Sequence, residues 1–435
     1  MKKTITVLLM LALCLSLCAC SAFQKVELPA VPTAAAETEQ PTETPAPVEQ
    51  QPEPTPAPVE DEPDAAEHRV IVKLERTELT ANDPQTGENK ILSFIYDTPT
   101  VIMDENPEAA AKINEFVGLL NESYYTGEDY GEGYGTGYNN MLTEAEDSYN
   151  YMVTNGYGEN FFMFSAERSY SVARNDGRVL TLLCNDYSYL GGAHGGYGTR
   201  AYCFDVSSGE LLTLADLGGD EAALHSLLKE KILDLAANDA DIQERIDGFI
   251  PDGEWESSLE ALIREGSWYF DHEGIRIFSD LYEISSYAAG MIEFKIPYDE
   301  LGDLIYSRFL PALPGEGSFR AVEGDALADG STEILDFVKV FQDGQTVYFI
   351  ADGAVSEVRL SSVDYSYGFY ETLQRWYCSR MEDAALQVVT VIPDGMPNLK
   401  LSWMSAQGEQ SVLLTQSGED GSLILLPASD IEAVG

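Results

Sequence analysis

A proline-rich stretch near the start of the chain separates a part that cannot build a packed core from a part that can. Residues 21–67 are rich in Pro, Thr, Ala and Glu, and the hexapeptide Thr-Pro-Ala-Pro-Val-Glu occurs at residues 44–49 and again at 55–60. With almost no large apolar side chains, this stretch cannot bury enough surface to offset the entropy lost on ordering. Its prolines favour an extended polyproline II chain, so we expect a stalk roughly 100 Å or more in length.

The segment before the stalk has the parts of a signal peptide. Two lysines precede a Leu-rich apolar run at residues 4–17, which is shorter than the ~20 residues that span a bilayer. The run leads into Leu-Cys-Ala-Cys at residues 17–20, which resembles the lipobox of bacterial lipoprotein precursors. The resemblance implies that residues 1–19 are removed and that Cys20 becomes a lipidated N-terminus at the outer face of the cell membrane. An ordinary cleaved signal without lipid is the alternative.

The part after the stalk is large and acidic. About 370 of the 435 residues remain there, enough for two or three domains with their own cores. The whole chain has 74 Asp and Glu against 25 Lys and Arg, a formal net charge of -49, and only a minority of the acidic residues lie in the stalk. Such a charge repels a phosphate backbone, which excludes non-specific nucleic-acid binding, and it attracts cationic partners. Solubility at a crowded surface is the alternative explanation.

Apolar periodicity predicts an α+β fold made of a mostly antiparallel sheet with flanking helices. Side chains spaced three and four apart predict helices at residues 107–120, 141–153 and 224–235. Pro107 stands at the first helical position of one of them, and Asp220 can cap another. Alternating runs predict strands at residues 70–74, 91–96, 161–172, 178–187, 200–206, 268–270, 275–278 and 291–296.

A Pro- and Gly-rich segment at residues 310–317 interrupts this pattern. Beyond it, short strand-like runs are separated by turn residues, which is typical of a small all-β sandwich or barrel. After the stalk at residues 20–67 we therefore expect an N-terminal α+β domain at 68–175, a second α+β domain at 176–309 and a small all-β C-terminal domain at 318–435.

Three cysteines remain after the stalk. Cys184 and Cys203 lie at equal distances on either side of the glycine-rich residues 191–196, so they would face each other if that segment is the tip of a hairpin. An exported protein can form such a disulfide, although cross-strand geometry is often poor for one, and free thiols are the alternative. Cys378 has no partner in the pattern, and we expect a buried free thiol.

The most specific motif of the chain is Tyr-Ser-Tyr-Leu-Gly-Gly-Ala-His-Gly at residues 187–195. It follows Arg-Asn-Asp-Gly-Arg-Val-Leu at 174–180, and further on stand Tyr-Glu-Ile at 282–284, Tyr-Ala-Ala-Gly at 287–290 and Phe-Lys-Ile-Pro-Tyr at 294–298. With these motifs, the chain resembles the extracytoplasmic domain family shared by the RsiV anti-sigma factor and the N-terminal part of the PdaC peptidoglycan deacetylase. The resemblance extends over roughly residues 68–306.

The resemblance implies an envelope sensor or binding module, with lysozyme as the family's known type of ligand. The anti-sigma factors add a transmembrane helix and a cytoplasmic part, and the deacetylases add a metal-binding catalytic domain. Neither addition is evident in this sequence, where a β-rich stretch follows instead. The resemblance therefore implies neither transcriptional control nor deacetylation here.

The sequence offers little catalytic chemistry. Its four histidines, His68, His194, His225 and His272, are far apart, and there is no Cys-x-x-Cys and no Gly-x-Ser-x-Gly motif. We therefore expect no metal, no cofactor and no catalytic residue. A peptidoglycan-modifying enzyme with His194 as acid or base is the alternative, as is a structural subunit of an envelope complex.

Tyrosines and His194 gather around the glycine-rich segment in sequence and are our candidate binding residues. Tyrosine in a Gly-rich loop gives rigid, amphipathic contact area. We expect these residues to bind a cationic protein of the lysozyme type or a cell-wall glycan, although about half of such strand tyrosines belong in a core. The set is Tyr187, Tyr189, His194, Tyr197 and Tyr202.

Overall fold

The computed structural model describes residues 67–128, 137–246, 248–251, 253–324, 332–340, 344–364, 370–391, 397–417 and 422–429. The expected signal peptide, Cys20 and the stalk up to residue 66 lie outside these residues. Across the described ranges, no helix has the length and apolar character needed to cross a membrane.

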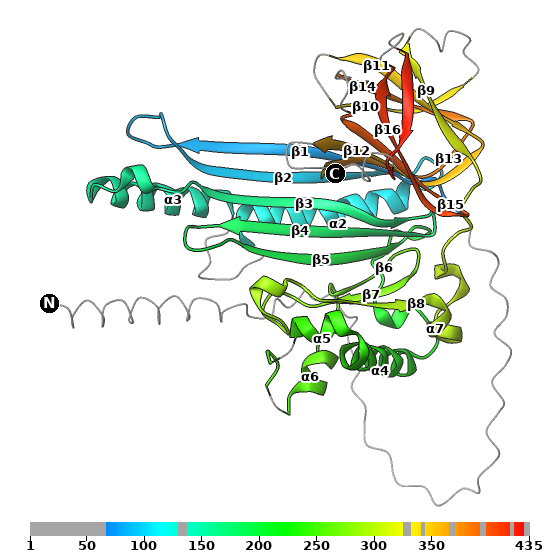
Figure 1. Cartoon of the computed structure of the whole chain (residues 1–435), viewed down its shortest axis with the longest axis horizontal. Coiled ribbons are helices and arrows are strands. Elements are labelled where there is room, and N and C mark those ends of the chain that lie inside the picture. The colour runs from blue at the N-terminus through cyan, green and yellow to red at the C-terminus, as the bar shows by residue number, and fades with distance from the viewer. Residues whose placement is uncertain are drawn as a thin grey trace, which may run out of the picture.

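The centre of the molecule is a ten-stranded sheet with the order β17-β16-β15-β12-β13-β1-β2-β3-β4-β5 (Figure 1). Its neighbours are antiparallel except for the parallel pair β2 and β3. This confirms the predicted α+β class with a mostly antiparallel sheet. The strands of its N-terminal half are β1 (Ile71–Asn82), β2 (Lys90–Ile102), β3 (Phe164–Asn175), β4 (Val179–Tyr189) and β5 (Gly196–Asp205).

Two helices make the crossover that a parallel strand pair requires. They are α2 (Pro107–Thr126) and α3 (Tyr138–Thr154). Asn106 caps α2 by accepting a hydrogen bond from the Ala109 backbone N–H, and Pro107 occupies the first turn. The apolar stripe of α2 packs on one face of the sheet, where Ile113 lies in a common core with strand residues such as Leu182.

A second layer covers the opposite face of β4 and β5. It contains a three-stranded sheet of β6 (Trp268–Phe270), β7 (Gly274–Phe278) and β8 (Glu293–Pro297). The largest core of the molecule lies here, because Ala201 and Cys203 of β5 pack with side chains of this sheet and of α4. The helices of the layer are α4 (Glu221–Asn238), α5 (Ala240–Ile246), α6 (Trp255–Glu260) and α7 (Tyr298–Leu301).

The C-terminal part is built of strands, as predicted, and it continues the N-terminal sheet. β13 pairs with β1 through Ile71–Cys378, Val72–Tyr377 and Lys73–Trp376, a seam that the sequence did not predict. A four-stranded sheet of order β10-β14-β11-β9 packs over this half. The strands are β9 (Ser318–Glu323), β10 (Glu333–Lys339), β11 (Gln345–Asp352), β12 (Ala354–Asp364), β13 (Tyr370–Glu382), β14 (Ala384–Thr390), β15 (Leu399–Ser405), β16 (Gly408–Gln416) and β17 (Leu423–Pro427).

The disulfide predicted between Cys184 and Cys203 is wrong. The β4–β5 hairpin ends with the pair Ser188–Gly196, so its turn is displaced from the centre of residues 191–196. Cys184 is therefore opposite Arg200, an odd number of residues from Cys203, and the two thiols point to opposite faces of the sheet. Both are buried free thiols, and so is Cys378, as expected.

Candidate functional site

Aromatic side chains from two distant segments meet at the tip of the β4–β5 hairpin. The His194 ring stacks on Tyr287, with ring centroids 4.0 Å apart and an angle of 24° between the planes. The Tyr282 and Tyr197 rings lie 5.8 Å and 5.9 Å from the same Tyr287 ring. The hairpin tip (residues 190–195) and the 280–290 segment therefore form one surface. We call Tyr187, His194, Tyr197, Tyr282 and Tyr287 the aromatic cluster.

Local hydrogen bonds fix the position of His194 within this cluster. The Tyr287 hydroxyl donates to the carbonyl oxygen of Gly195 at 3.0 Å, and Nδ1 of His194 lies 3.0 Å from that same oxygen. Nε2 of His194 lies 3.4 Å from the Tyr282 hydroxyl. Because both ring nitrogens contact neighbouring groups of the cluster, the ring serves to join the tip to the 280–290 segment.

Glycine is required in the tip for two reasons. Gly191 and Gly192 have φ values of +90° and +100°, which side chains disfavour. A Cβ atom on Gly195 would come within 2.5 Å of the Tyr187 ring, so this glycine provides the space that the ring occupies. Tyr187 remains 41% exposed, and one of its faces is thus available to a partner.

Tyr282 presents a second exposed ring from a strained backbone. It is 39% exposed, and its φ of +60° lies in the left-handed region that tyrosine rarely adopts. Such strain persists only where the surroundings hold it, and it occurs often at functional sites. The neighbouring Glu283 provides the restraint, because its carboxylate accepts hydrogen bonds from the Asp280 backbone N–H at 2.8 Å and from Arg264 at 2.6 and 2.9 Å.

Charges at the base of the cluster are balanced. Asp280 pairs with Arg200 at 2.9 Å and with Arg264 at 3.1 Å, and Arg264 also pairs with Glu283. These ion pairs connect β5 to the 280–290 segment. They therefore support the shape of the cluster without giving it a local net charge.

An open groove is lined in part by the same 280–290 segment. Ser286, Ala288 and Ala289 line it together with Asp241, Glu244, Arg245, Gly248 and Phe249. Arg245 holds the segment in place by donating to the carbonyl oxygens of Ala289 at 2.8 Å and Met291 at 2.7 Å. The Phe249 ring is exposed, and a second groove that shares Glu244 and Gly248 reaches the exposed ring of Trp255. Because Arg245 also pairs with Asp241 at 3.5 Å, the groove combines two carboxylates and one cation with an aromatic rim.

The structure brings together three of the five candidate binding residues. Tyr187, His194 and Tyr197 belong to the aromatic cluster, and the Tyr189 hydroxyl braces the tip by donating to the Gly192 carbonyl oxygen at 3.1 Å. Tyr202 does not join the cluster. Its ring points to the face of the sheet that α2 covers, where it packs edge-on against Phe116 with ring centroids 5.2 Å apart. Burial raises the pKa of the Tyr202 hydroxyl, as expected for a core position.

Sequence reasoning missed Tyr282 and Tyr287 as members of the site. Both stand in the motifs at residues 282–284 and 287–290 that carry the family resemblance, which was the available signal. In the described part of the chain, no group of three or more His, Cys, Asp or Glu side chains is arranged to hold a metal ion.

The fold defines an α+β protein in which one large sheet carries further layers on both faces. Two family models match the sequence of this chain: "Deacetylase PdaC" over residues 85–197, and "Protein of unknown function (DUF3298)" over residues 218–299. The resemblance expected from the sequence is thereby confirmed: residues 85–197 are similar to the PdaC family and residues 218–299 are similar to the DUF3298 family. Tyr187, His194 and Tyr197 come from the first match, and Tyr282 and Tyr287 from the second.

Two solved structures of DUF3298 family proteins are similar to this chain. The one from Bacteroides fragilis NCTC 9343 is 17% identical, with 56% of this chain and 96% of that chain covered and a TM-score of 0.42. The one from Pseudomonas aeruginosa PAO1 is 20% identical, with 58% and 99% covered and a TM-score of 0.36. Among curated proteins, no match was found.

Proposed function

We propose that this chain is a non-catalytic binding protein of the cell surface that captures a basic protein of the lysozyme type. The contact surface is the aromatic cluster together with the neighbouring groove. The observation that carries the proposal is that the 280–290 segment contributes both to a cluster with the exposed rings of Tyr187 and Tyr282 and to a groove with Phe249, Asp241 and Glu244.

Charge supplies the long-range part of recognition. A net charge of -49 creates a field that steers a cationic protein towards the molecule and raises the rate of association. The effect acts over about 8 Å at physiological salt, so it weakens as salt is added. Glu244 then places negative charge in the groove itself, beside Asp241, which already pairs with Arg245 at 3.5 Å and is 78% exposed on its side chain.

The aromatic rings supply the short-range part. Tyrosine and tryptophan carry much of the binding energy at protein interfaces, because a large rigid area is buried at little entropic cost. The Tyr282 ring is fixed in advance by its own backbone and by the stacked pair of His194 and Tyr287. Such preorganisation lowers the entropy lost on binding.

In this proposal, Cys20 and the stalk determine where the site lies relative to the membrane. Lipid on Cys20 holds the chain to the outer face of the membrane, and the extended stalk lifts the aromatic cluster away from it. The chain then holds or blocks its ligand outside the cell, or presents it to a separate protein.

Titration of the purified full chain with lysozyme at low and at raised salt tests the proposal. We expect binding that weakens as salt rises and a roughly tenfold loss of affinity in Tyr282→Ala. Tyr151→Ala is the matched control, since Tyr151 of α3 is 69% exposed and lies outside the cluster. Absence of binding at both salt concentrations would contradict the proposal.

A cell-wall glycan is the second candidate ligand. The stack of His194 on Tyr287 beside the exposed Tyr282 ring favours it, because sugar rings also bind to positioned aromatic faces. Titration with muropeptides separates the two candidates. Binding of muropeptides that is lost in Tyr282→Ala and is insensitive to salt would favour the glycan.

A further inference from the structure

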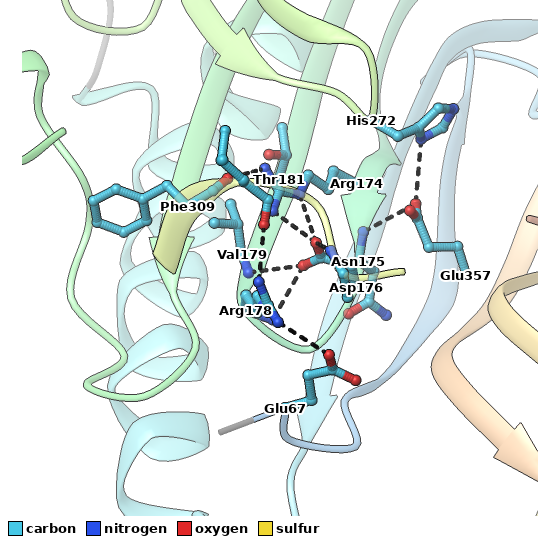
Figure 2. A network of polar contacts seen from close by, with 12 residues as sticks. Glu67, Arg174, Asn175, Asp176, Arg178, Val179, Thr181, His272, Phe309 and Glu357 are labelled. Carbon is cyan, nitrogen blue, oxygen red and sulfur yellow. Dashed lines mark hydrogen bonds and ion pairs between the residues drawn. The ribbon is translucent and has the colours of Figure 1, made fainter. Parts of the chain in front are cut away.

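A buried carboxylate joins three parts of the molecule at the end of β4 remote from the hairpin tip. Glu357 of β12 is 6% exposed, and its Oε2 lies 3.5 Å from Nδ1 of His272, in the turn between β6 and β7 (Figure 2). The same oxygen accepts a hydrogen bond from the Asn175 backbone N–H at the end of β3, at 3.4 Å. The carboxylate therefore connects the DUF3298-matched layer, the central sheet and the C-terminal strands.

The backbone of β12 is distorted where it presents this carboxylate. Glu357 has a φ of +48°, and the pairing of β12 with β15 shifts register between Ser356 and Arg359. A β-bulge of this kind redirects a side chain away from the regular alternation of a strand. Because glutamate rarely adopts a positive φ, the contacts of its side chain must hold it there.

Nδ1 of His272 is buried at this contact and makes no hydrogen bond of normal geometry to any residue that the structure describes. A lone pair on Nδ1 would face the negative charge of Glu357 and be repelled, whereas an N–H proton there is attracted. The imidazolium and one neutral tautomer both carry a proton on Nδ1, but only the imidazolium also adds a positive charge, which the Glu357 carboxylate attracts.

The charged groups around His272 favour its protonation on balance. Glu357 raises the pKa of His272 most strongly. Burial opposes it, and so does Arg359, which lies 3.9 Å from the same Glu357 oxygen, whereas Asp271 of the same turn raises the pKa further. Behind Glu357, Arg174 and Asp176 form a buried ion pair at 2.6 Å. The pKa of His272 is consequently raised above its ordinary value.

Other contacts at this junction show that it is the place where the parts of the chain are attached. Arg174 donates to the carbonyl oxygen of Phe309 at 2.7 Å, and Asp176 accepts from the Ala312 backbone N–H at 2.9 Å, so both hold the connection to the C-terminal strands. Arg178 pairs with Glu67 at 3.2 Å, where the expected stalk ends (Figure 2). Glu357 therefore belongs to a junction that holds the segment leading into the C-terminal half.

We propose that His272 and Glu357 form a pH-dependent clasp between the β6–β8 layer and the C-terminal half of the ten-stranded sheet, closed while His272 is protonated. The clasp is independent of what the aromatic cluster binds. Because the pKa of His272 is raised in the folded chain, the stabilisation is fully present below the ordinary histidine pKa and is lost as pH rises through the raised value. Alkaline conditions then leave the β1–β13 seam and the connecting segment to hold the C-terminal half.

Histidine titration by NMR in the full chain tests the clasp directly. The His272 resonance is assigned by its loss in His272→Gln. In Glu357→Gln, we expect the His272 titration to move to lower pH than in the wild type, because the carboxylate that raises its pKa is gone. A His272 titration that is unaffected by Glu357→Gln overturns the proposal.

A double-mutant cycle provides the readout that a merely structural contact would not give. The unfolding equilibrium constants of the wild type, His272→Gln, Glu357→Gln and the double variant are compared at pH 5.5 and pH 8.5. The coupling between the two side chains should amount to roughly a fivefold change in the constant or more at pH 5.5, and to less than about twofold at pH 8.5. Equal coupling at both pH values contradicts the clasp.

Discussion

The two ends of β4 have opposite chemistry. At the end that leads into the hairpin tip, aromatic rings are exposed and the charges are balanced. At the other end, Arg174 at the end of β3 is fully buried and pairs with Asp176, which is also buried, in the turn that follows. One strand thus connects a surface suited to contact with a partner to a junction that holds the molecule together.

The two histidines show the same contrast. His194 at the tip contacts a carbonyl oxygen and a hydroxyl group, neither of which changes charge near neutral pH. His272 at the junction faces a carboxylate. We therefore expect substitutions at the two ends to separate stability from binding.

The largest expected effect is on stability, at the buried ion pair. Arg174→Met leaves the Asp176 carboxylate buried without its cation, which costs about 3–5 kcal/mol of unfolding free energy. Urea unfolding measures it. Arg320→Met is the control, because Arg320 and Asp352 form an exposed pair at 3.1 Å whose loss costs about 1 kcal/mol or less. Similar losses of unfolding free energy in the two variants would show that the buried pair stabilises the fold no more than an exposed pair does.

This ion pair also predicts a loss of stability in acid. Burial raises the pKa of Asp176, but Arg174 and backbone N–H groups outweigh it, so the pKa is lowered. The stabilisation is present above the ordinary aspartate pKa and disappears as pH falls through the lowered value. In unfolding experiments across the acid range, the wild type should lose stability there, and Asp176→Asn should lose less.

The second effect is on binding, at the tip. Tyr282→Gly removes the exposed ring and relieves the positive φ, so affinity for the ligand should fall about tenfold while stability is unchanged or rises by about 1 kcal/mol. Calorimetric titration and thermal unfolding measure the two quantities on one sample. A variant that binds normally would show that the strained tyrosine is not part of the contact surface.

Local structure could be predicted from the sequence because its causes are local. The stripe containing Ile113 and Val117 gave the position of α2, and Pro107 marked its start. The alternating residues of β3 and β4 gave two long strands. These patterns report which side chains are buried, and burial dominates the choice of helix or strand.

Long-range pairing could not be predicted in the same way. The three pairs between β1 and β13 join residues about 300 positions apart in the sequence, and no residue type there specifies that partner or that register. The disulfide was mispredicted for the same reason, since a turn displaced along the hairpin moved Cys184 and Cys203 to opposite faces. The approach of Tyr287 to His194 likewise depends on how the β6–β8 layer packs.

The next prediction concerns the thiols on the two faces of the sheet. Burial raises the pKa of Cys203 to about 11 and that of Cys378 to about 12, so little thiolate forms at pH 8. Mass spectrometry after treatment with iodoacetamide should show slow labelling of Cys184, Cys203 and Cys378 in the folded protein and complete labelling after unfolding without reductant. If the unfolded protein were labelled completely only after reductant is added, a disulfide would be present, contrary to the structure.

The smallest expected effect is on the rate of association, at the groove beside the tip. Asp241→Asn with Glu244→Gln removes two charges from a chain that carries a net -49, so the overall field hardly changes. Association with lysozyme should slow about twofold to fivefold at low salt and by less at raised salt, because short-range pairing at the groove accounts for only part of the steering. Exchange of two acidic residues on α3, Glu144→Gln with Glu146→Gln, matches the change in charge at a site remote from the groove. If stopped-flow measurements give the same rates for the two double variants, net charge explains the attraction, and the groove has no role of its own.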